Sequence, residues 1–71
     1  MHVKELIQMI KTRREMLQVT QEDLADLSGV GLRTLKQLES GKGNPTVHTL
    51  EKLSDVLGLE LKLVLKTKKN D

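Results

Sequence analysis

Three polar residues in the stretch GLRTLKQLES, residues 31–40, have side chains that suit recognition of duplex DNA. With Leu35 as the reference of a helical wheel, successive residues are about 100° apart. Arg33, Lys36 and Gln37 then fall about 100° to 200° away from it, on the opposite face. Arg pairs with guanine, Gln with adenine, and Lys with guanine or phosphate. A charged outer face is also typical of any soluble helix, so both interpretations stay open here.

The same helix must carry an apolar side that fixes it to the rest of the domain. Leu35 and Leu38 form this side, and Leu32 lies at its edge, where core packing and contact with a thymine methyl are both open. Glu39 also falls on the buried side, and Arg14 lies on the apolar stripe of the first helix. Because an unpaired buried charge is costly, we predict an ion pair between Arg14 and Glu39.

Apolar residues at helical spacing predict two helices before this one. The first covers about residues 3–17, and its apolar stripe consists of Val3, Leu6, Ile7, Ile10 and Leu17. The second covers residues 21–28. Thr20 is its N-cap, Asp23 completes a capping-box pattern, and Gly29 ends it.

A loop and a fourth helix follow the third. The segment GKGNP has the glycines and proline of a loop. Thr46 caps a helix over residues 47–57, which ends at Gly58. Its apolar stripe consists of Val47, Leu50, Leu53 and Leu57. The sequence therefore predicts an all-α domain of four helices over residues 1–58.

After Gly58 the apolar period changes to two. The alternating leucines are Leu59, Leu61, Leu63 and Leu65, which predict a β-strand over residues 59–67. A single strand leaves its backbone groups unpaired, so we predict that it pairs with its copy across a two-fold homodimer. A short helix or a frayed end is the alternative, since Leu and Lys also favour helices. Residues 68–71 are expected to form a basic tail.

The charge balance says little unless its distribution is considered. The 71 residues include 12 Lys+Arg and 10 Asp+Glu, for a net charge of +2. Residues 1–58 hold 8 basic and 8 acidic side chains, so the basic excess lies after them. A DNA-binding surface on the helical domain therefore requires basic and acidic residues to occupy different faces.

Missing residue types exclude several functions. The chain has no Cys for a disulfide or a cysteine zinc site. It has no Phe, Tyr or Trp for stacking single-stranded bases, an interaction worth about 1–3 kcal/mol per base, so duplex DNA is favoured. It has no signal peptide and no membrane-spanning run, so we expect a cytoplasmic protein without a membrane partner. Its two histidines suit no catalytic or metal site, and no enzyme activity or cofactor is expected.

The stretch TQEDLADLSGVGLRTLKQLESGKGNPT resembles the lambda-repressor-like (Xre/Cro type) helix-turn-helix family. The shared pattern is a Thr-Gln start, Leu-Ala in the middle, Gly-Val at the turn and Leu-x-x-Leu-Glu-x-Gly in the recognition helix. The match covers about residues 10–58. It implies that the polar face of the third helix reads duplex DNA rather than being merely solvated.

The resemblance assigns roles to individual residues. It implies a phosphate contact at Thr20 and Gln21, and an internal ion pair between Arg14 and Glu39. The residues that it implies for base reading on the third helix are Leu32, Arg33 and Gln37, with Lys36 beside them and Thr34 in the same DNA-binding set. Those that it implies for the sugar-phosphate backbone are Lys42, Asn44 and Thr46. Gly31 departs from the pattern, because the family commonly has a Ser or Thr cap there.

The C-terminal segment is similar to that of HipB-type antitoxins, in which a terminal strand pairs across the dimer. This resemblance implies a homodimeric repressor of its own toxin–antitoxin operon, with a palindromic operator and a HipA-like toxin kinase as a further partner. The alternatives are an inhibitor that chiefly binds a toxin kinase, or a control repressor of a phage or a restriction–modification system.

Overall fold

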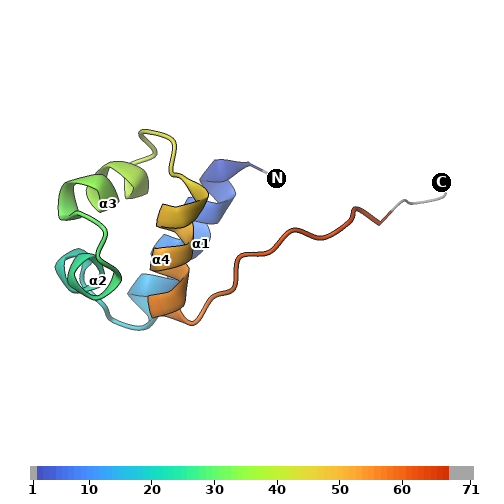
Figure 1. Cartoon of the computed structure of the whole chain (residues 1–71). Helices are drawn as coiled ribbons and strands as arrows, with labels where there is room; N and C mark the ends of the chain where they lie inside the picture. The colour runs from blue at the N-terminus through green and yellow to red at the C-terminus, as the bar shows by residue number, and fades with distance from the viewer. Residues whose placement is uncertain (1, 68–71) are drawn as a thin grey trace.

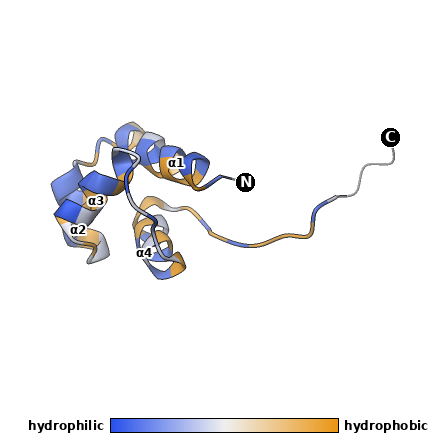
Figure 2. Cartoon of the chain, turned by 90° about the horizontal axis from the view of Figure 1, so that it is seen from above, coloured by the Kyte–Doolittle hydropathy of each residue, from blue (hydrophilic) through white to orange (hydrophobic). Residues whose placement is uncertain are grey.

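The computed structural model describes residues 2–67, and it shows four helices followed by an extended segment (Figure 1). The helices are α1 (Val3–Met16), α2 (Gln21–Ser28), α3 (Leu32–Glu39) and α4 (Val47–Leu57). The four predicted helices are confirmed, with ends within two residues of those expected. Both α2 and α3 lie on the opposite side of the molecule from the extended segment (Figures 1 and 2).

The core lies where the four helices meet. Leu24, Leu35, Leu53 and Leu57 have less than 2% of their surface exposed, and each comes from α2, α3 or α4. Ile7 and Ile10 cover them from α1. Each fully buried leucine stabilises the fold by about 1.5–3 kcal/mol relative to exposure. The buried apolar stripe of α1 is shorter than predicted, because Val3 and Leu17 at its two ends are exposed.

Local signals in the sequence set the helix ends. The Asp23 amide donates to Thr20 Oγ1 over 3.0 Å, and the Thr49 amide donates to Thr46 Oγ1 over 3.1 Å, so both threonines cap helices as predicted. At the other end of α4, Gly58 takes a left-handed conformation with φ 71°. Arg13 Nε donates over 2.9 Å to the carbonyl of Leu57, which places a cation at the C-terminus of α4.

The C-terminal segment changes character within a few residues. Leu59 and Leu61 are half-buried and pack against the core. Leu63 and Leu65 are 101% and 96% exposed, although they continue the same alternation. No residue between 59 and 67 forms a strand in the structure, so the strand and its pairing across a dimer stay predictions. The basic tail, residues 68–71, lies outside the described residues.

Over residues 2–67, the structure has no helix that is both long and apolar enough to cross a membrane.

Candidate nucleic-acid interface

The outer face of α3 is a polar surface on a helix whose inner face is fully packed. Arg33, Thr34, Lys36 and Gln37 are exposed, while Leu35 and Leu38 on the opposite side are buried. Figure 2 shows the hydrophilic turns of α3 at the end of the molecule farthest from the C-terminal segment. The structure thus brings together the polar residues that the sequence analysis assigned to this helix.

A shallow hollow lies across this face. The α3 side chains that line it are Leu32, Arg33, Lys36 and Gln37, and Ser40 and Lys42 complete it. Leu32 packs against the core and also lines the hollow, so core packing is confirmed and its contact with a thymine methyl stays a prediction. Ser40 was not singled out from the sequence. Its hydroxyl donates over 2.8 Å to the carbonyl of Gln37, which ties it to the end of the helix.

The loop after α3 is held against the helix by backbone hydrogen bonds. The Lys42 amide donates to the carbonyl of Gln37 over 2.9 Å, and the Gly41 amide donates to the carbonyl of Leu38 over 3.0 Å. Gly41 needs its left-handed backbone, with φ 85°, to make this turn. Lys42 and Asn44 are exposed as expected for backbone contacts. Lys4 lines a second hollow together with Lys42, a proximity that their separation in the chain concealed.

Thr46 is less available to a phosphate than the resemblance implies. Its hydroxyl accepts from the amide of Thr49 and donates over 3.1 Å to Thr49 Oγ1. Both of these hydrogen bonds serve the first turn of α4. The side chain of Thr46 is therefore occupied as a helix cap, and only Lys42 and Asn44 of this group are left with free side chains in the described structure.

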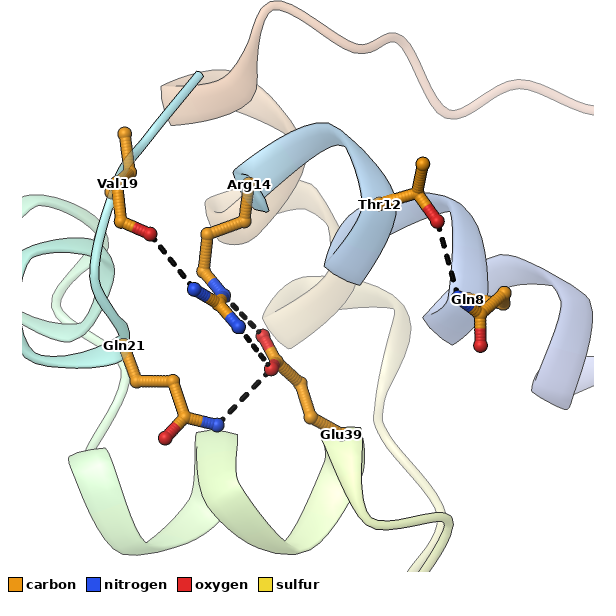
Figure 3. Close-up of polar contacts among 6 residues, drawn as sticks. All are labelled: Gln8, Thr12, Arg14, Val19, Gln21 and Glu39. Carbon is orange, nitrogen blue, oxygen red and sulfur yellow. Dashed lines mark hydrogen bonds and ion pairs between the residues drawn. The ribbon is translucent and has the colours of Figure 1, made fainter. Parts of the chain in front are cut away.

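A buried ion pair orients α3. Arg14 Nε and Nη2 donate to the two carboxylate oxygens of Glu39, each over 2.8 Å, as the sequence analysis expected (Figure 3). Arg14 Nη1 donates over 2.8 Å to the carbonyl of Val19. The side chains of Arg14 and Glu39 are 12% and 3% exposed. The pair therefore joins α1, the turn before α2 and the end of α3 through one forked contact.

Gln21 faces this ion pair rather than the solvent. Its Nε2 donates over 3.0 Å to Glu39 Oε1, as Figure 3 shows. The resemblance implied a phosphate contact for Gln21 and Thr20, yet the side chains of both are engaged within the protein. The Thr20 hydroxyl only accepts in its bond with the Asp23 amide, so its own hydrogen and the backbone amides at the start of α2 remain suited to an anion there.

The surroundings of Glu39 keep it ionised. Burial alone would raise the pKa of this carboxyl. The hydrogen bonds from Arg14 and Gln21, together with the charge of Arg14, outweigh burial and hold the pKa below its ordinary value. As a carboxylate at neutral pH, Glu39 accepts the hydrogen bonds from Arg14 and Gln21 that connect α1 and α2 to the end of α3.

The exposed charges of α2 differ in sign from those of α3 and the loop that follows it. Glu22, Asp23 and Asp26 are exposed on α2, whereas Arg33, Lys36 and Lys42 lie on α3 and the following loop. A small net charge is therefore compatible with a positive face. Gly31 begins α3 without a side-chain cap, and the departure noted in the sequence is present in the structure.

Comparison with known proteins identifies the family. The helix-turn-helix family model matches residues 10–64. The chain is 35% identical over 52 residues to a cryptic phage CTXphi transcriptional repressor, RstR, of Vibrio cholerae, covering 73% of this chain and 46% of that protein. It is 40% identical over 62 residues to an uncharacterized HTH-type transcriptional regulator of Haemophilus influenzae, covering 87% of this chain and 59% of that protein.

The chain thus spans about half the length of these two curated relatives, 46% and 59%. The matched residues include α2, α3 and the turn between them, which carry the polar face and its buried support. The chain belongs to the helix-turn-helix family of DNA-binding proteins.

Proposed function

We propose that this protein is a sequence-specific transcriptional repressor that inserts α3 into the major groove of duplex DNA. The observation that carries the proposal is the exposed set of Arg33, Lys36 and Gln37 on a helix held by the Arg14–Glu39 ion pair. A rigid helix with these side chains suits direct reading of base edges. The name of the Vibrio cholerae relative, a phage transcriptional repressor, supports repression as the outcome.

The proposal divides the work between two groups of residues. Lys42 and Asn44, with the amides at the start of α2, bind phosphates and supply affinity that falls as salt rises. Arg33 and Gln37, with Leu32, Thr34 and Lys36 around them, distinguish base pairs. A homodimer paired through residues 59–67 would place two copies of α3 in successive major grooves, about 34–36 Å apart.

Two substitutions with the same loss of charge test this division. Arg33→Ala should relax base preference at one position per half-site and cost about 1–3 kcal/mol on the preferred duplex alone. Lys42→Ala should weaken binding to preferred and random duplexes alike and lower the salt dependence. Fluorescence anisotropy with the two duplexes at several salt concentrations measures both effects. Equal weakening of both duplexes by Arg33→Ala would assign that residue to a phosphate and contradict the proposal.

The similarity to HipB-type antitoxins would add a toxin kinase as a second partner. Copurification of a kinase-like protein with the tagged chain, expressed from its native operon, tests this addition. Both curated relatives are named as transcription regulators, one of them from a phage, which favours DNA-directed regulation as the main activity.

A further inference from the structure

An apolar hollow runs along α1 beside the point where the C-terminal segment leaves the helices. Met9, Met16 and Leu59 line it, with polar side chains of α1 between them. Met9 and Met16 are 58% and 70% exposed. Met9 also lines a neighbouring hollow, in which Leu59 and Leu61 lie. The segment therefore covers one part of a continuous apolar surface and leaves the part along α1 open.

The segment itself has an uncovered apolar face. In an extended chain alternate side chains point to the same side, so Leu63 and Leu65 continue the face of Leu59 and Leu61. The first two leucines of this face contact the helices, and the last two contact nothing in the protomer. Figure 2 shows the segment as a largely hydrophobic run that extends away from the helical body. Such exposure marks a surface for association.

Symmetry restricts how two such segments pair. In an antiparallel pair, directly opposite residues project to the same face of the sheet. A two-fold axis perpendicular to the sheet keeps every residue on its own face, so two opposite residues are an even number of positions apart in the sequence. The residue midway between them lies on the axis, opposite its own copy. An axis at Lys62 would place two lysines opposite each other, and an axis at Val64 would place Lys62 opposite the partner's Lys66 twice. Like charges in these positions are destabilising.

Two registers avoid this repulsion. An axis at Leu61 would place Leu65 opposite the partner's Leu57, which is buried in its own α4 and is unavailable. An axis at Leu63 places Glu60 opposite the partner's Lys66 on one face, in two symmetric pairs. On the other face it places Leu61 opposite the partner's Leu65. The remaining pairs set Lys62 opposite the partner's Val64 and Leu59 opposite the partner's Thr67, so this register contains no like-charge pair over residues 59–67.

Resting on the dimer of the proposed function, we propose that residues 59–67 of two copies form an antiparallel sheet with its two-fold axis at Leu63. The second copy occupies the α1 hollow. Neighbouring strands lie about 4.8 Å apart, so the partner's Leu65 lies beside Leu61. Met9 lines both the hollow that contains Leu61 and the open hollow along α1. If the partner strand is added on the α1 side of the segment, the partner's Leu65 therefore lies over the open hollow.

A charge exchange tests the register. Glu60→Lys should weaken the dimer about tenfold in sedimentation equilibrium, because it creates two repulsive pairs with the partner's Lys66. Adding Lys66→Glu should restore dimerisation. The matched control combines Glu60→Lys with Lys62→Glu instead. Lys62 Nζ lies 3.7 Å from Glu60 Oε1 of the same chain on the exposed surface. Rescue by Lys62→Glu, or by neither change, would overturn the register.

Cross-linking tests the axis, since the natural chain has no cysteine. Leu63→Cys should give a disulfide-linked dimer on mild oxidation. Leu61→Cys should not, because the two copies of residue 61 would be about 13 Å apart along the strands, beyond disulfide reach. Cross-linking at position 61 and not at position 63 would overturn the proposal.

A pair of serine substitutions tests the hollow. Leu65 and Val64 are both exposed in the protomer, at 96% and 74%, but only Leu65 lies on the face toward α1. Leu65→Ser should weaken dimerisation about a hundredfold and Val64→Ser should leave it nearly unchanged. The reverse order would overturn the proposal. The register alone fails if the natural chain selects duplex DNA while Lys66→Glu gives no rescue and Leu63→Cys gives no cross-link. The proposed function fails if the natural chain selects no duplex.

Discussion

The helical body and the C-terminal segment use leucine in opposite ways. In the body, Leu24, Leu35, Leu53 and Leu57 are fully buried, and their contacts hold α3 in place within a single protomer. In the segment, Leu63 and Leu65 have the same side chain and almost no cover. These leucines of the body are therefore covered within one protomer, whereas Leu63 and Leu65 of the segment are left uncovered by it, as the proposed dimer requires.

Leucine substitutions in the two regions should separate folding from association. Leu53→Ala removes a fully buried side chain and should lower the free energy of unfolding by about 2–5 kcal/mol. Leu65→Ser should not change the free energy of unfolding at concentrations where the chain is monomeric, since Leu65 has no cover there. Urea denaturation at several protein concentrations measures both. Equal destabilisation by Leu65→Ser at low concentration would mean that the segment packs within its own protomer.

Breaking the Arg14–Glu39 ion pair should lower the free energy of unfolding of the helical body. Arg14→Ala leaves the Glu39 carboxylate buried without its cation and should cost about 3 kcal/mol of stability. Arg14→Met combined with Glu39→Met removes both charges at similar volume and should recover most of that loss. Chemical denaturation of the three variants compares them. A cost below about 1 kcal/mol for Arg14→Ala would show that solvent screens the pair.

Lowering the pH should weaken the contact between Arg14 and Glu39. The folded state lowers the pKa of Glu39 below its ordinary 4.5, so the unfolded chain binds this proton more readily. The stabilisation is complete above the ordinary pKa and is lost as the pH falls through the lower folded value. Denaturation of the natural chain and of Glu39→Gln between pH 7 and pH 2 isolates this contribution. The natural chain should lose more stability than Glu39→Gln, and parallel curves would contradict the assignment.

Gln21→Ala should have the smallest effect of these changes, and it tests whether the side chain binds Glu39 or a phosphate. Gln21→Ala removes one hydrogen bond to Glu39 and should cost about 1 kcal/mol of stability. Because its amide faces Glu39 rather than the solvent, the salt dependence of DNA binding should stay the same. Anisotropy titrations at several salt concentrations, beside urea denaturation, measure the two quantities. A smaller salt dependence with unchanged stability would make Gln21 a phosphate ligand after all.

The body could be predicted from the sequence because its signals are local. Apolar period, N-caps and C-cap glycines located the four helices, and the same period placed Arg14 and Glu39 on facing sides. The engagement of Gln21 with Glu39 could not be predicted, since it depends on how α2 crosses the end of α3. The hydroxyl of Thr46 was assigned to DNA and also to a cap, and these two uses compete for the same oxygen.

The segment shows a different limit. Its alternation predicts a strand, but a strand needs hydrogen-bond partners, and one protomer does not supply them over residues 59–67. The pattern specifies which face is apolar without specifying what covers it. The open hollow along α1 became visible only when Met9, Met16 and Leu59 were placed together in space.

Selection of bound sequences from a pool of random duplexes by the purified natural chain tests the central claim, that two copies of α3 read neighbouring turns of one DNA. We predict enrichment of a palindrome whose half-site centres lie about 10 base pairs apart. Enrichment of single, non-palindromic sites, or no enrichment at all, would contradict it.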